Sequence, residues 1–342
     1  MVTDKKNHQR SILWLCKIII LLQVGICNAQ NHVSGFVFSA KDSTAISGGV
    51  VYFEGTSIGE TTGENGEFKI VFKEGNSSLV ISSIGFESVV VNAQMIKNNS
   101  SFLRIYLPEK SEELETVFLE TDSWSREEKL KIFKREFLGN NHAAKSCRII
   151  NENDIKLRFI KSSNTLIASS REPLVIANEY LGYLLKYNLR DFMVKLKTIN
   201  NKLVPIAVHY HGYSFFKPLR SNVSRKSRRN RNKSYLGSSF HFMRALYSNE
   251  LYQNNFKLFY GDIQVPVHKF FKITDDHKLK KVALLVDKIF IIYKTNQQSV
   301  LVSKGVFTID EFGYHSPPES INLYGEMSKK RISELLPLDY QP

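Results

Sequence analysis

Apolar and polar positions alternate with a period of two along seven short runs near the start of the chain. In Glu67–Lys73, for example, Phe68, Ile70 and Phe72 fall on one side of an extended backbone, which is the pattern of a half-buried strand. Seven such runs, separated by turn residues, predict a β-sandwich. The runs are His32–Ser39, Gly49–Glu54, Ser57–Thr62, Glu67–Lys73, Ser78–Ile84, Phe86–Asn92 and Ser101–Leu107.

Glycines separate these runs in a characteristic order. Gly63 and Gly66 bracket a tight turn and Gly85 allows a chain reversal, because glycine adopts a positive φ at little steric cost. The glycine-bearing segments resemble the carboxypeptidase-regulatory-like domain, which is common in exported proteins of Bacteroidetes-type bacteria. The resemblance implies a seven-stranded transthyretin-like sandwich over residues 30–108. The segments are Gly35-Phe36-Val37, Ser47-Gly48-Gly49-Val50-Val51-Tyr52, Gly55-Thr56-Ser57-Ile58-Gly59, Thr61-Thr62-Gly63-Glu64-Asn65-Gly66-Glu67-Phe68 and Ser83-Ile84-Gly85-Phe86.

After an acidic linker, residues 109–123, the hydrophobic pattern changes to that of a helix. Ser125 and Glu128 have the spacing of a capping box, and Gly139 marks the end of the helix. The apolar face of this helix consists of Leu130, Phe133 and Phe137.

Residues 124–342 as a whole predict one mixed, β-rich α+β domain with two or three helices. Besides the helix that begins near residue 125, we expect a second helix at Tyr235–Tyr252 and a short one at Ser328–Leu335. The fold class predicted for the chain is therefore mainly β, of the α+β type. The expected strands include Ile155–Ile160, Thr165–Ala168, Tyr180–Leu189, Leu203–Tyr210, Phe256–Tyr260, Lys281–Lys294, Val300–Ser303 and Gly305–Asp310.

Six segments of this second half carry a resemblance. They are Glu172-Pro173-Leu174-Val175-Ile176-Ala177-Asn178, Leu181-Gly182-Tyr183, Asn230-Arg231, Tyr235-Leu236-Gly237-Ser238, His241-Phe242-Met243-Arg244-Ala245-Leu246-Tyr247 and Leu335-Leu336-Pro337. Together they resemble the region that follows the regulatory-like domain in a group of Bacteroidetes envelope proteins. The resemblance implies an architecture and an envelope location, but no reaction.

The first 29 residues predict a secretory signal peptide. Basic residues precede an apolar run, Ile12–Ile26, that is shorter than the roughly 20 residues needed to span a bilayer. Cleavage after Ala29 would give an exported protein of the periplasm or outer membrane, without a transmembrane helix; a retained N-terminal anchor is the alternative. Cys147 would then be the only cysteine, and we expect it to be a small buried hydrophobe.

Motifs for catalysis are weak in this chain. None of the nine His residues has a Glu three positions later, so the zinc-binding spacing of a carboxypeptidase is absent. Gly55-Thr56-Ser57-Ile58-Gly59 matches a nucleophile elbow in letters only, since strands flank it on both sides. We therefore expect a non-enzymatic protein with no cofactor or bound metal. The alternative is an enzyme of unrecognised type that uses His209, His211, His241, Glu172 and Arg244.

Charge is distributed unevenly along the chain. The formal net charge is +14, yet no Asp or Glu occurs from Phe192 to Asn249, a segment with twelve Lys and Arg residues. The candidate binding residues in and near its densest part are Arg225, Lys226, Arg228, Arg229, Arg231, Lys233 and Arg244.

Such a basic segment predicts an anionic partner, and export narrows the choice. Nucleic acid becomes an unfavoured partner outside the cytosol, whereas an anionic lipid, lipopolysaccharide, an acidic glycan or an envelope protein remains compatible. Two alternatives stay open: a solvated loop that leads into the second helix, and an accessory subunit of an outer-membrane complex. Arg231 and Arg244 could instead order a site or simply pack the second helix.

Overall fold

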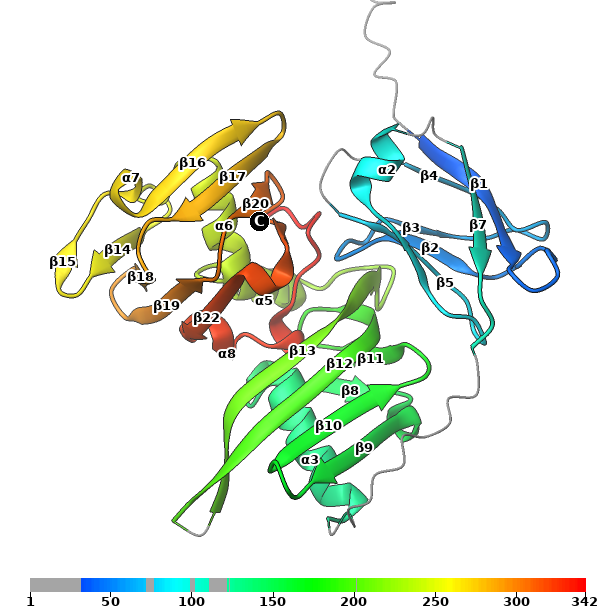
Figure 1. The fold of residues 1–342 in the computed structure, drawn as a ribbon, viewed down its shortest axis with the longest axis horizontal. Coiled ribbons are helices and arrows are strands. Elements are labelled where there is room, and N and C mark those ends of the chain that lie inside the picture. Colours follow the sequence, from blue (N-terminus) through cyan, green and yellow to red (C-terminus); the bar gives the residue numbers. More distant parts are fainter. Residues whose placement is uncertain (1–31, 72–76, 99–101, 111–121, 123, 201) are drawn as a thin grey trace, which may run out of the picture.

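The computed structural model describes residues 32–342 apart from residues 72–76, 99–101, 111–121, 123 and 201. The expected signal peptide, residues 1–29, and most of the expected linker, residues 109–123, lie outside the described residues. Figure 1 shows three strand-rich parts arranged around the C-terminal segment, residues 330–342. They are the N-terminal strands, the sheet built on β12 (Tyr183–Ile199) and β13 (Lys202–Pro218), and the strands from β14 (Phe256–Tyr260) onward.

Seven strands form the N-terminal part, and each corresponds to one of the seven predicted runs. They lie in two sheets with the orders β4-β1-β7 and β3-β2-β5-β6, so the predicted β-sandwich is confirmed. Alternate side chains such as Val37 and Phe68 are buried between the sheets. The elements are β1 (His32–Ser39), β2 (Val50–Phe53), β3 (Gly59–Thr61), β4 (Glu67–Val71), β5 (Leu79–Ser82), β6 (Val89–Val91), α2 (Ala93–Asn98) and β7 (Phe102–Leu107).

The first helix after the sandwich, α3 (Arg126–Leu138), matches its prediction closely. The Ser125 hydroxyl accepts a hydrogen bond from the N–H of Glu128, and the Glu128 carboxylate accepts one from the N–H of Ser125. Gly139, at φ 109°, follows the last residue of the helix. Phe133 and Phe137 are fully buried against the adjoining sheet.

That sheet contains a hairpin much longer than predicted. β12 (Tyr183–Ile199) and β13 (Lys202–Pro218) pair along their whole length, whereas the sequence predicts shorter strands, Tyr180–Leu189 and Leu203–Tyr210. The register shift between Leu189 and Asp191, which face Gly212 and His211, interrupts the alternation close to the predicted end of each strand. The other elements here are α4 (His142–Lys145), β8 (Cys147–Ile149), a 3₁₀ turn (Glu152–Asp154), β9 (Ile155–Ile160), β10 (Thr165–Ser170) and β11 (Leu174–Asn178).

The remaining strands form two further sheets, with the orders β15-β14-β18-β19-β22 and β16-β17-β20-β21. The single strand predicted at Lys281–Lys294 is wrong, because the chain turns after Leu284 and its two halves join different sheets. The strands are β14 (Phe256–Tyr260), β15 (Ile263–Gln264), β16 (Phe271–Asp276), β17 (Leu279–Leu284), β18 (Lys288–Tyr293), β19 (Gln297–Ser303), β20 (Phe307–Asp310), β21 (His315–Ser316) and β22 (Ile321–Gly325).

Helices in this region are short. The second predicted helix becomes α6 (Ser239–Tyr247), because Gly237 adopts φ 68° and the Ser238 side chain caps a new helix start. Among the described helices, α3, α5 (Arg225–Tyr235) and α6 exceed two turns, which fits the two or three helices expected, but α5 is not one of the helices predicted. The helix predicted at Ser328–Leu335 is wrong in its bounds, because the chain there forms a four-residue helix and a separate 3₁₀ turn. The other helical elements are α5 (Arg225–Tyr235), α7 (Val267–Phe270), a 3₁₀ turn (Pro318–Ser320), α8 (Glu326–Lys329) and a 3₁₀ turn (Ile332–Glu334).

Most buried apolar side chains of residues 124–342 gather in two clusters, and Phe215 packs instead with Tyr52 of the sandwich. One lies between α3 and the sheet of β12, with Phe133, Phe192 and Leu185. The other surrounds α6 and the two sheets that contain β14 to β22, which we call the last sheets, with Phe242, Ile291 and Phe307. The structure thus divides the core of this region between two groups of strands.

A turn of the sandwich, residues 55–59, joins the sandwich to β13 and to the C-terminal segment. The N–H of Gly55 donates to the carbonyl oxygen of Ser214 at 2.8 Å, and the N–H of Phe216 donates to that of Thr56 at 3.0 Å. The C-terminal segment completes the joint, since the N–H of Leu338 donates to the carbonyl of Gly55 at 2.7 Å. Asp339 accepts hydrogen bonds from the N–H and the hydroxyl of Ser57. We call residues 55–59 the joint turn.

Gly59 is required here by close packing. The ring of Phe215, from β13, is 2 % exposed and stacks on Tyr52 with ring centroids 4.9 Å apart. A Cβ atom on Gly59 would lie 2.4 Å from this ring and 2.9 Å from the Cβ of Tyr52. The missing side chain therefore lets the hairpin approach the sandwich.

Glu54, half-buried beside the joint turn, adds a titratable group. Its carboxylate accepts a hydrogen bond from the hydroxyl of Tyr314 at 3.2 Å, which links the sandwich to the last strands. Burial raises the pKa of Glu54 to about 7, and the Tyr314 hydrogen bond only partly offsets this. A neutral carboxyl therefore predominates at this contact in mildly acidic solution.

Gly59→Ala is expected to lower the free energy of unfolding of the chain by about 1–3 kcal/mol, because the Phe215 ring must move. The matched control is Gly305→Ala, where an added Cβ meets no atom within 4 Å. Denaturant unfolding monitored by circular dichroism would measure both. Equal stability of the two variants would contradict this account of the joint.

Glu54→Gln is expected to flatten part of the pH dependence of stability. Since the folded-state pKa lies above the ordinary value of 4.5, the stabilisation tied to the protonated form is complete below pH 4.5 and is lost as the pH rises through 7. The wild-type chain should lose up to about 3 kcal/mol relative to Glu54→Gln over this range. Parallel curves from urea titrations at several pH values would refute the assignment.

Candidate functional site

The densest basic segment forms a helix, α5, so the alternative of a solvated loop is wrong for Arg225–Tyr235. The side chain of Ser224 accepts a hydrogen bond from the N–H of Ser227 and caps the first turn. At the other end, the ammonium of Lys330 donates to the carbonyls of Ser234 and Leu236. Small polar residues line the buried face of α5, which is why no apolar period predicts this helix.

The outer face of α5 carries five of the seven candidate residues. Helical spacing places them on one side, opposite buried Ser227 and Ser234. In the described part of the chain, no carboxylate forms an ion pair with any of the five. They are Arg225, Lys226, Arg228, Arg229 and Lys233, all exposed; we call this set the α5 face.

The other two candidates, Arg231 and Arg244, point into the molecule. The guanidinium of Arg231 lies 3.8 Å from the ring centroid of Tyr183 and donates to the carbonyl of Leu181. That of Arg244 lies over Phe240 and donates to the carbonyls of Phe312 and Leu338. Both guanidinium groups are engaged in packing, which favours the structural alternative for these two residues.

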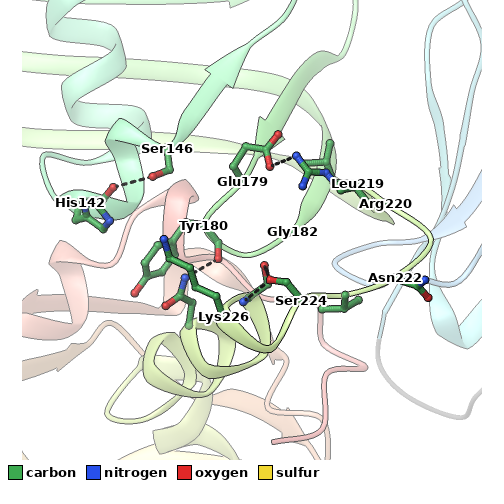
Figure 2. Close-up of a pocket in the computed structure, with 13 residues that line it drawn as sticks. His142, Ser146, Glu179, Tyr180, Gly182, Leu219, Arg220, Asn222, Ser224 and Lys226 are labelled. Atoms are coloured by element: carbon green, nitrogen blue, oxygen red, sulfur yellow. Dashed lines mark hydrogen bonds and ion pairs between the residues drawn. The ribbon is translucent and has the colours of Figure 1, made fainter.

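A polar pocket of about 300 Å³ adjoins the first turn of α5 (Figure 2). Lys226 and Arg220 line it, and the Arg220 guanidinium forms an ion pair with Glu179 at 3.0 Å. Asn230, also in the wall, donates to the carbonyl of Tyr180. Because Lys226 belongs to both, the pocket and the α5 face form one continuous surface. Of these wall residues, only Lys226 is among the binding residues predicted from the sequence. Arg220 could also have been predicted, because it lies in the segment from Phe192 to Asn249 that contains no Asp or Glu.

The histidines of the enzymatic alternative have separate surroundings. His209 is exposed on β13, and His211 packs edge-on against Tyr213 with centroids 5.7 Å apart. His241 is buried, and burial lowers its pKa. Its Nδ1 accepts the N–H of Gly237, and its Nε2 lies 2.9 Å from the Asn254 side-chain oxygen. Within the described ranges, no group of three or more His, Cys, Asp or Glu residues is arranged to hold a metal ion.

The remaining polar candidates also take separate positions. Glu172 pairs with Lys110 at 2.8 Å and so ties the end of the sandwich to the sheet of β12. Burial raises the pKa of the Cys147 thiol to about 12, which keeps it protonated and inert. The motif that matched a nucleophile elbow is the joint turn, which lies between antiparallel strands β2 and β3.

A second cavity, of about 380 Å³, lies where the three parts meet. Its walls include Glu54, His211, Tyr314 and Arg331. The sequence does not single out Glu54 or Tyr314, because they are 260 positions apart and only the tertiary fold brings them together. Among the described helices, none is long and apolar enough to cross a membrane.

Comparison with known proteins identifies one part of the chain. Residues 33–119 match the model of the CarboxypepD_reg-like domain, and no curated protein matches the chain. A solved structure, a protein of unknown function from Bacteroides fragilis that is described as membrane-associated, aligns at 10 % identity over 86 % of this chain and 97 % of that chain. Its TM-score of 0.17 is too low to support an argument. By its sequence match and its two-sheet sandwich, the N-terminal part of this chain is a CarboxypepD_reg-like domain.

Proposed function

We propose that this protein is a non-catalytic, exported protein of the cell envelope that binds a polyanionic envelope component through the α5 face. The observation that carries the proposal is the presence of five exposed cations on one side of a helix. Among the described residues, no carboxylate forms an ion pair with any of these five. Unpaired cations on a rigid element attract anions without first breaking an internal ion pair. The sandwich then serves as a docking or spacer module.

The chemistry of the surface favours a polymer that bears phosphate or carboxylate groups. One anionic group would enter the pocket beside Lys226, whose wall also holds the ion pair of Arg220 with Glu179. Neighbouring groups would lie along the helix against Arg225, Arg229 and Lys233. Lipopolysaccharide and acidic glycans both present repeated charges of this kind, and export favours them over nucleic acid.

The α5 face lies apart from the internal packing of the molecule, which makes the proposal testable without loss of folding. Its side chains are exposed, whereas Ser227, Ser234 and Tyr235 hold the helix in place. Substitution of the outer cations therefore removes charge but leaves the buried face intact.

Replacement of Arg225, Lys226, Arg229 and Lys233 by Gln should weaken binding to lipopolysaccharide by up to about 1,000-fold at low salt, since each cation near an anionic surface contributes about 1 kcal/mol. Affinity of the unmodified chain should fall steeply as salt rises. Titration by fluorescence anisotropy, with labelled lipopolysaccharide, would measure both effects.

The matched control replaces four exposed lysines on the last sheets with Gln, namely Lys257, Lys269, Lys272 and Lys304. This control removes the same charge and should retain most of the affinity. If both quadruple variants bind equally, net charge rather than the α5 face determines binding, and the proposal fails.

A further inference from the structure

The far end of the β12–β13 hairpin leaves the rest of its sheet. β10 pairs with β12 only as far as Lys195, so among the described strands the last residues of β12 and the first of β13 pair only with each other. Figure 1 shows this end of the hairpin projecting beyond β9 and β10. We call residues 195–200 and 202–207 the arm.

One face of the arm combines lysine and apolar side chains in a regular way. Residues that oppose each other in an antiparallel ladder share a face, and Leu196 and Val194 are buried on the face that α3 covers. The other face therefore carries three successive cross-strand pairs, each with one lysine and one apolar residue. The pairs are Lys195 with Ala207, Lys197 with Val204, and Lys202 with Ile199.

Exposure of the apolar members is substantial. Ile199 is 46 % exposed, Val204 is 38 % exposed, and Ile206, in the irregularity of the ladder, is 52 % exposed. Met193, one pair further along the same face, is 44 % exposed. The sheet to which these side chains belong therefore leaves them partly open to solvent.

The strands at this end of the molecule contain no acidic residue. The chain has no Asp or Glu from Phe192 to Asn249, and none from Ile155 to Arg171, the segment that forms the neighbouring β9–β10 hairpin. On the helix that covers the sheet, Glu127 and Glu128 lie in the first turn of α3, which packs on the opposite face.

From these observations we infer that the arm is a second binding surface, which docks on the surface of an anionic lipid bilayer. Apolar side chains enter the boundary between headgroups and acyl chains, while the lysine stems lie beside them and their ammonium groups reach the lipid phosphates. A second copy of this chain is a less suitable occupant, because two arms in contact would bring lysines against lysines.

The depth of docking follows from the backbone. In the arm, no strand of the described ranges pairs with β13 on the side away from β12, so the N–H and C=O groups on that side form an open edge. Such groups are costly in the hydrocarbon core but are satisfied by water and headgroups at the interface. The arm therefore rests at the interface and does not span the bilayer.

The test uses the processed form, the chain from residue 30 onward, with Ile199→Trp as a reporter. On vesicles of phosphatidylcholine mixed with phosphatidylglycerol, the emission should shift to shorter wavelength, and on phosphatidylcholine alone it should shift little. Val306→Trp, at a site 59 % exposed on the last sheets, is the control and should not shift. Lack of a shift on the anionic vesicles would overturn the inference, as would an equal shift on both vesicle types.

A second measurement separates apolar docking from charge. The triple variant Ile199→Ser, Val204→Ser, Ile206→Ser keeps every lysine and should bind anionic vesicles roughly tenfold more weakly or worse in sedimentation assays. The matched control, Ile84→Ser, Ile263→Ser, Val306→Ser, changes residues that are 85 %, 70 % and 59 % exposed elsewhere, and should bind as the unmodified chain does. Equal binding of the two triple variants would overturn the inference.

Two further measurements distinguish this inference from its rivals. When the four Gln substitutions of the α5 face are combined with Ile199→Trp, the emission shift of the reporter should remain. The two proposals can therefore fail separately: loss of lipopolysaccharide binding does not contradict the arm proposal, and loss of the emission shift does not contradict the lipopolysaccharide proposal. An emission shift that occurs without vesicles and grows with protein concentration would assign the arm to self-association and would overturn the bilayer proposal.

Discussion

The arrangement of this molecule depends on the hydrogen bonds of the joint turn. Backbone groups of Gly55 and Thr56 bind β13 on one side and Leu338 on the other, so a single loop of the sandwich contacts both the long hairpin and the C-terminal segment. Burial of Phe215 against Gly59 and Tyr52 excludes water from this contact. Because backbone hydrogen bonds are stronger where water is excluded, the small contact can hold the sandwich in place.

The C-terminal segment distributes this constraint to the other parts. Leu338 contacts the joint turn, the carbonyl of Leu338 accepts from Arg244 of α6, and Lys330 holds the end of α5. Glu334, between them, accepts a hydrogen bond from Asn141 beside α4. As a result, α5 is fixed on its inner side, and its outer cations remain available to an external partner. Arg231 and Arg244 belong to this internal framework, although by sequence they look like members of the basic cluster.

Local patterns account for what could be predicted from the sequence. Alternation revealed the seven sandwich strands, and the spacing of Ser125 and Glu128 revealed the start of α3, because in both cases neighbouring residues carry the signal. Prediction failed where the signal is distant or unusual. α5 buries Ser227 and Ser234 and, at its last residue, Tyr235, so its buried face shows no apolar period on a hydropathy scale. The joint turn resembled a catalytic motif because its glycines serve contact with Phe215 and Leu338, which lie far away in the chain. The α5 face was found as a basic segment, but its division into outer and inner cations required the structure.

Hydrogen–deuterium exchange on the chain from residue 30 onward, with and without lipopolysaccharide, tests the central claim most directly, since it locates the bound surface without any substitution. The account predicts that bound ligand slows exchange in α5 and in the segment around Arg220, with little change in the sandwich strands. Slower exchange confined to the sandwich or to the last sheets, with α5 unaffected, would contradict it.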